Sequence, residues 1–209
     1  MQRRTFLAGA GTALAAAIGM GSLPALAAEV SLDDLLHDPA APVGGNPKGD
    51  LTIVSFSDYN CPFCKKAEPD LARAVREDGN IRLVYKDWPI LSQASVYGAR
   101  MALAAQYQGS YERAHHALMS ISGRAVSQED MEQALATAGI DMQRLKTDLE
   151  TRKKEITQLL ARNMDQADAL GLQGTPTYLI GPLLASTLDY DGFREAISEA
   201  RNRQAGDAK

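Results

Sequence analysis

Two short apolar runs flank a helical segment near the middle of the chain. Residues 51–57 (LTIVSFS) and 81–85 (IRLVY) are rich in β-branched and aromatic side chains and predict buried strands. Between them the pattern predicts a helix that opens at Cys61, has Pro62 in its first turn and stops near Gly79. This order predicts a βαβ unit whose helix starts at the carboxyl end of the first strand.

The next segment, 91–170, has apolar residues at helical spacing and is punctuated by glycines. A crossover helix needs far fewer residues, so we expect an all-helical insertion of about four helices. The strand pattern returns at 177–180 (TYLI), and a weaker strand is expected at 183–188. Asp191 is then predicted to cap a last helix.

These patterns predict an α/β protein with an inserted all-helical subdomain. We expect 51–90 and 171–205 to form the two halves of the α/β domain, with 91–170 between them. Residues 28–50 are short and broken by proline and glycine, so we expect an irregular lead-in with one brief helix around 32–36.

The first residues are typical of an export signal. Arg3 and Arg4 precede an uncharged stretch that runs to Ala28, and the order Arg-Arg-Thr-Phe-Leu resembles the twin-arginine signal. Small residues at 25–27 place the expected cleavage after Ala27, so 1–27 would be removed. An uncleaved anchor is the alternative. In both cases the rest of the chain is expected to be exported, into a compartment where disulfides persist.

Composition and charge exclude several classes of protein. Hydrophobic residues make up 45% and charged residues 23% of the chain, which is typical of a globular protein. The net charge is −4 and there is no basic block, so we expect no nucleic-acid partner. The only cysteines are Cys61 and Cys64, which excludes a scaffold with several disulfides.

Both cysteines lie in the motif Cys61-Pro62-Phe63-Cys64, after a predicted strand and at the start of a helix. The free N–H groups and the dipole at a helix N-terminus favour negative charge, so we expect a low pKa for Cys61. Cys64 lies one turn along and faces inward. We therefore predict that Cys61 is the exposed, attacking or attacked sulfur and that Cys64 resolves the intermediate.

Two other roles compete for this cysteine pair. A structural disulfide between residues three apart closes too small a loop to constrain the unfolded chain much. A zinc site needs two further ligands, and the only histidines are His37, His115 and His116. The adjacent pair points about 100° apart around a helix. We expect these histidines on the surface or partly buried, and no metal site.

Three motifs in order resemble the DsbA family of thiol:disulfide oxidoreductases: 56–66 (FSDYNCPFCKK), 85–91 (YKDWPIL) and 174–177 (GTPT). The resemblance implies a thioredoxin fold with a helical insertion and a periplasmic location. It implies that Pro176 is a cis-proline facing the active site, that Thr175 lines the substrate groove, and that Pro62 and Phe63 shape the site. It also implies no cofactor beyond the redox-active pair, and a membrane redox partner that regenerates it.

Two positions depart from the family pattern. Many strongly oxidising members have histidine where Phe63 stands, so a weaker oxidant is expected here. Ser55 stands six residues before Cys61, where relatives often bury an acid that moves protons to and from the resolving cysteine. That role is either absent or supplied by water or another group, with the vicinity of Lys86 as a candidate.

The leading hypothesis is a periplasmic oxidoreductase that introduces disulfides into unfolded or partly folded exported proteins through a mixed disulfide at Cys61. One alternative is an isomerase or reductase kept reduced by a membrane partner. Isomerases of this superfamily carry an N-terminal oligomerisation module, for which 29–50 leave no room, so we expect a monomer and oxidation. An alternative of another class is a non-catalytic thioredoxin-like binding module with a structural disulfide.

Overall fold

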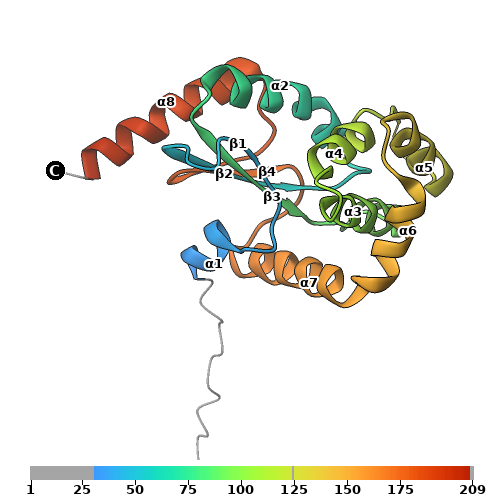
Figure 1. The fold of residues 1–209 in the computed structure, drawn as a ribbon. Helices are drawn as coiled ribbons and strands as arrows, with labels where there is room; N and C mark the ends of the chain where they lie inside the picture. Colours follow the sequence, from blue (N-terminus) through green and yellow to red (C-terminus); the bar gives the residue numbers. More distant parts are fainter. Residues whose placement is uncertain (1–30, 124, 208–209) are drawn as a thin grey trace, which may run out of the picture.

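A five-stranded mixed sheet forms the centre of the fold in this computed structural model, which describes residues 31–123 and 125–207 (Figure 1). The strand order is β1-β3-β2-β4-β5, and only the central pair β2 and β3 is parallel. The strands are β1 (Val43–Gly45), β2 (Leu51–Ser57), β3 (Ile81–Asp87), β4 (Thr177–Ile180) and β5 (Leu183–Ala185). The export signal and its cleavage site lie outside the described residues.

Helices cover both faces of the sheet (Figure 1). The long helices α2 (Pro62–Asp78) and α8 (Tyr190–Asp207) pack together on one face. The short helix α1 (Leu32–His37) and α7 (Lys153–Ala169) lie on the other. Because side chains alternate along a strand, neighbouring residues of β3 face different layers. The hydroxyl of Tyr85 contacts Glu112, whereas Lys86 lies near Asp38.

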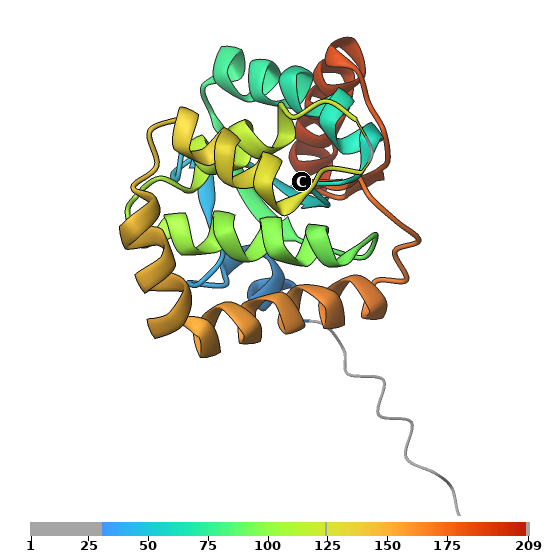
Figure 2. The same cartoon turned by 90° about the vertical axis from the view of Figure 1, so that its right-hand side faces the viewer.

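Of the helices between β3 and β4, all but α7 gather at one end of the sheet (Figure 2). The described residues contain five: α3 (Gln93–Gln106), α4 (Tyr111–Met119), α5 (Gln128–Thr137), α6 (Met142–Thr151) and α7. The expected number of about four was wrong because α6 and α7 are separated by a break at Arg152, which is neither glycine nor proline. The sequence interpretation used glycines to separate the helices, and there is no glycine at this break.

Three further details correct the sequence predictions. The lead-in contains a strand, β1, which pairs antiparallel with β3 and forms one edge of the sheet. The weak strand expected at 183–188 ends at Ala185. The cap of α8 is Asp189 rather than Asp191, because Asp189 accepts the N–H of Gly192 through its carboxylate and that of Phe193 through its carbonyl. None of the helices in the described part of the chain is long and apolar enough to cross a membrane.

Candidate active site

The sheet topology brings three separate loops together at the same end of the central strands. The parallel strands β2 and β3 end side by side, since Ser57 pairs with Asp87. Strand β4 runs antiparallel to β2, so its first residue, Thr177, lies opposite Phe56 at the same edge. The CxxC motif follows β2, the Trp-Pro-Ile-Leu part of the second motif follows β3, and Thr175 and Pro176 precede β4. All three motifs of the sequence resemblance therefore meet here.

Asp58 and Asn60 hold these loops together. The carboxylate of Asp58 accepts backbone N–H groups from Asn60 at 2.7 Å, Ile90 at 2.9 Å and Leu91 at 3.0 Å. The side chain of Asn60 donates to Ser92 and accepts the N–H of Val126. Both side chains are buried, so these bonds are shielded from water. The roles of Asp58 and Asn60 were not predicted from the sequence, because the loops that they join lie more than thirty residues further along the chain.

Cys61 is the N-cap of α2. Its sulfur accepts the backbone N–H of Cys64 at 3.3 Å, in the position where a capping oxygen usually stands. Pro62 follows in the first turn, where a missing N–H removes no helical hydrogen bond. The thiol also donates to the carbonyl oxygen of Thr175 at 3.2 Å, and the bond between Thr175 and Pro176 is cis. The cis-proline that the resemblance implied is thus present and adjoins the cysteine.

The two free thiols differ strongly in acidity. A hydrogen bond from the Cys64 thiol, together with the backbone N–H groups of Cys64 and Phe63, lowers the pKa of Cys61 to about 6, although burial opposes this. Burial and the neighbouring Cys61 raise the pKa of Cys64 far above its usual range. The order of acidity agrees with the roles expected from sequence. The expected exposure of Cys61 was wrong, because Cys61 is 3% exposed and Cys64 2%.

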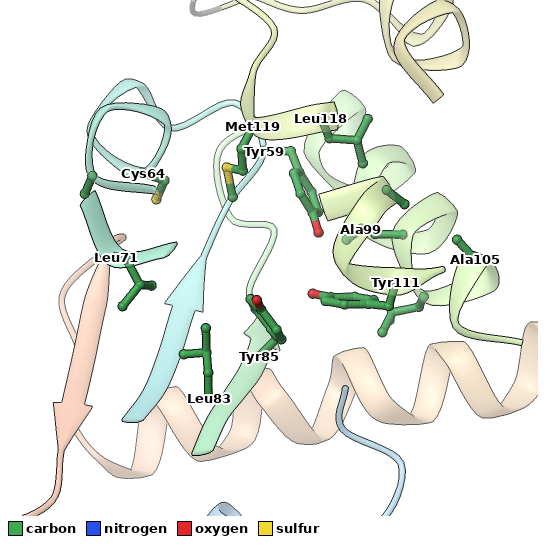
Figure 3. Close-up of a cluster of buried hydrophobic side chains, with 14 of the residues drawn as sticks. Tyr59, Cys64, Leu71, Leu83, Tyr85, Ala99, Ala105, Tyr111, Leu118 and Met119 are labelled. Atoms are coloured by element: carbon green, nitrogen blue, oxygen red, sulfur yellow. The ribbon is translucent and has the colours of Figure 1, made fainter. Parts of the chain in front are cut away.

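Cys64 faces the interior of the molecule. It belongs to the same buried cluster as Leu71 of its own helix, Tyr59, and Met119 of α4 (Figure 3). Phe63, the other residue between the cysteines besides Pro62, points the other way and is 54% exposed. The exposed side chains of Ile90 and Leu91 follow β3 at the same edge of the sheet. Three exposed apolar side chains therefore lie on the segments that follow β2 and β3.

A polar cluster lies behind Cys64, between α2 and α4. Glu68 is one turn after Cys64, and its carboxylate oxygens are 3.2 Å from Nε2 of His115 and 3.1 Å from Nδ1 of His116. Burial alone would raise the pKa of Glu68, but the two histidines outweigh it and hold the pKa below its usual range. His115 is completely buried, which corrects the expectation of a surface or partly buried histidine. No local pattern distinguishes it, since its partner lies on another helix.

Asp87 and Lys86, at the end of β3, face opposite sides of the sheet. The carboxylate of Asp87 accepts the hydroxyl of Tyr111, and burial raises its pKa to about 6. Ser55 pairs with Tyr85, on the side of α2, whereas Lys86 pairs with Phe56 and lies 3.9 Å from Asp38. Lys86 therefore faces away from Cys64, whereas Asp87, its neighbour in sequence, faces the other side of the sheet, so the suggestion that a group near Lys86 replaces the missing acid stays a prediction. Among the described residues no group of three or more metal-binding side chains could hold an ion.

Two adjacent thiols of unequal acidity can exchange a disulfide with a third thiol, which is the chemistry of thioredoxin-like oxidoreductases. The chain belongs to the thioredoxin family, whose model matches residues 37–199. A thioredoxin-like oxidoreductase from Silicibacter pomeroyi has 40% sequence identity and a TM-score of 0.76, over 82% of this chain and 98% of its own. The predicted thioredoxin fold with helical insertion is confirmed.

Other relatives agree with the DsbA-like resemblance. The thiol-disulfide exchange protein alpha-DsbA2 from Wolbachia pipientis has 29% identity and a TM-score of 0.75, over 80% of this chain and 90% of its own. A probable disulfide bond formation protein D from Bacillus anthracis is 24% identical over 74% of this chain and 76% of that protein.

The first curated relatives are much longer proteins. A Na(+)/H(+) antiporter, NhaA 1, from Salinispora arenicola is 27% identical over 66% of this chain, which corresponds to 21% of the antiporter. The chain thus spans about a fifth of that relative, so the similarity concerns one part of the antiporter.

Proposed function

We propose that this protein introduces disulfides into exported proteins through a redox-active Cys61–Cys64 pair. The observation that carries the proposal is the difference between the two thiols: the pKa of Cys61 is about 6, whereas that of Cys64 is strongly raised. A sulfur that is stable as a thiolate is a good leaving group, so a mixed disulfide on Cys61 is readily displaced. The reduced pair is correspondingly stabilised, which favours donation of the disulfide.

The proposed reaction has two exchange steps. A substrate thiolate attacks the sulfur of Cys61, the Cys61–Cys64 bond breaks, and Cys64 leaves and takes up a proton. A second substrate thiolate then attacks the substrate sulfur of the mixed disulfide and releases Cys61 as a thiolate. Two electrons pass from the substrate to the protein. A membrane redox partner would accept them and restore the disulfide, and no separate cofactor is needed.

Thr175 and Pro176 would shape the groove in which the substrate backbone lies beside Cys61, with Pro62 and Phe63 forming the opposite wall. The proposal places the protein in the periplasm, exported by the twin-arginine-like signal at 1–27 and active as a monomer. The lead-in at 28–50, the two halves at 51–90 and 171–205, and the helical subdomain at 91–170 would make up its domains.

Oxidation of a reduced, unfolded protein with several cysteines tests this function. The oxidised form of this protein should generate disulfides stoichiometrically, and the Cys61 thiol should react with an alkylating agent with a midpoint near pH 6 rather than near the ordinary value of about 8.5. A protein that only rearranges scrambled disulfides would instead be an isomerase. An ordinary thiol pKa and no exchange in either assay would indicate a binding module with a structural disulfide.

A further inference from the structure

A cleft of about 660 Å³ lies beside the cysteine pair, between α2 and the end of α4. One wall is a single face of α2, formed by Pro62, Lys65, Lys66 and Pro69. The opposite wall contains Met119 and Ile121. Neither cysteine lines the cleft, but Pro62, which follows Cys61 directly, does, so the cleft begins one residue after the reactive cysteine and extends along the helix. A polypeptide bonded to Cys61 could continue into it.

The walls combine positive charge with apolar surface. The ammonium group of Lys65 donates to the carbonyl oxygen of Gly123 at 3.0 Å and so joins the two walls, while Lys66 also lines the cleft and is exposed. Glu68 also lines the cleft, but its carboxylate is held by His115 and His116. The nearby buried acid Asp58 is engaged by three backbone N–H groups.

The distances of the lysines and of Pro69 from Cys61 along α2 determine which residues of a bound chain would contact them. A helix rises about 1.5 Å per residue, so Lys65 and Lys66 lie about 6–8 Å from Cys61 along the axis, and Pro69 about 12 Å. An extended chain advances about 3.3 Å per residue. Its second residue after the bonded cysteine would thus reach the lysines. Its fourth would reach Pro69, in a cleft whose opposite wall includes Met119 and Ile121.

We propose that this cleft binds the substrate chain next to the cysteine joined to Cys61, and selects segments with a carboxylate two residues and an apolar side chain four residues from that cysteine. The inference rests on the proposed function, since it names the substrates that the same site prefers. Attraction between the substrate carboxylate and the lysine ammonium groups raises the rate of encounter and fixes the register of the bound chain.

Two peptides that differ in one kind of residue test the proposal. Each has a central cysteine and the symmetrical sequence Leu-Ser-X-Ser-Cys-Ser-X-Ser-Leu, with X either Glu or Lys, so that the direction of binding does not matter. Oxidised protein converts two peptide thiols into a peptide disulfide, which chromatography quantifies. Because X also changes the acidity of the peptide thiol, the rate of each peptide with the protein is divided by the rate of the same peptide with hydroxyethyl disulfide, a small uncharged reagent.

The Glu peptide should react about fivefold faster than the Lys peptide at low salt, and this preference should shrink in 0.5 M salt. Lys66→Glu should abolish or reverse the preference. Lys154→Glu, an exposed substitution on α7 with the same change in net charge, should retain it. The rate with dithiothreitol, an uncharged thiol, reports whether either substitution alters the disulfide itself.

Two results would overturn the inference while leaving the proposed function intact: equal rates for both peptides, or an unchanged preference in Lys66→Glu. If neither peptide were oxidised although dithiothreitol reduced the protein, the proposed function itself would fail. A serine at both Leu positions of the Glu peptide should lower the rate about threefold, and an unchanged rate would remove the apolar part of the proposal.

Discussion

The hydroxyl of Tyr59 lies 3.0 Å from Nδ1 of His115, which joins the loop before the CxxC motif to the inserted helix α4. The other ring nitrogen of His115 faces Glu68 of α2. The imidazole also packs against the rings of Tyr85 and Tyr111. One buried histidine therefore connects the active-site loop, the helix that carries the cysteines and the helical insertion.

Removal of this hydroxyl should destabilise the protein. In Tyr59→Phe, Nδ1 of His115 loses its hydrogen-bond partner in a site without water access, which costs about 1–3 kcal/mol of the free energy of unfolding. Denaturant unfolding measures the loss. Tyr107→Phe, on a half-exposed ring, is the matched control and should change stability by less than about 0.5 kcal/mol. Equal effects of the two substitutions would contradict a bracing role for Tyr59.

Local pattern was sufficient to predict the centre of the fold. The runs at 51–57 and 81–85 are apolar and β-branched, and they form the two parallel strands. The helix between them is delimited by its own residues, since Pro62 stands in the first turn and Gly79 ends the helix in the left-handed conformation. Cys61 was placed correctly at the helix start for the same reason. Each of these features depends on residues close in sequence.

Features that depend on distant partners were not predictable. Strand β1 has three residues, two of them glycine, and exists because β3 offers a free edge for pairing. Cys61 is buried because the surrounding loops cover it, and its position at the start of the helix does not determine this. Asp58 is an ordinary polar residue in sequence, and its role appears only when the loops after β2 and β3 meet.

Substitution of each cysteine should give opposite results. Cys61→Ser removes the sulfur with the low pKa and should abolish exchange. In Cys64→Ser the Cys61 thiolate can still attack a substrate disulfide, which forms a mixed disulfide and releases the other substrate sulfur as a thiolate. No neighbouring thiol then displaces the substrate, so the mixed disulfide on Cys61 should accumulate. Mass spectrometry after non-reducing digestion identifies the attached cysteine. Adducts on Cys64 in the Cys61→Ser protein, with none in the other variant, would reverse the assignment of roles.

Phe63→His should make the protein a stronger oxidant. The backbone N–H of Phe63 already contributes to lowering the pKa of Cys61, and a protonated imidazole on this residue of the active-site turn would add positive charge that favours the thiolate. Each further pKa unit corresponds to about 1.4 kcal/mol, or about 30 mV for a two-electron couple, so the potential should rise by about 30 mV. Equilibration with glutathione measures it. Phe63→Leu, an uncharged control at the same exposed position, should change the potential much less.

Asp87 should make stability depend on pH in the direction opposite to acids whose pKa is lowered by a salt bridge in the folded state. Burial raises its pKa to about 6, whereas an unfolded aspartate has a pKa of about 3.9. Between these values the folded protein holds a proton that the unfolded chain has lost. The free energy of unfolding therefore falls as pH rises through this window, and the full penalty is present above about pH 6.

Asp87→Asn removes this titration, so the stability difference between the variant and the wild type should change with pH. The free energy of unfolding of the variant should rise by about 2–3 kcal/mol relative to that of the wild type between pH 4 and pH 7, since two pKa units correspond to about 2.7 kcal/mol. The new amide hydrogens lower stability by an amount that does not vary with pH, and Glu68 titrates in both proteins, so neither alters the slope of the difference. Denaturant unfolding of the two oxidised proteins at four pH values measures it. A constant difference would show that Asp87 is ionised throughout, with Tyr111 and His115 compensating fully for its burial.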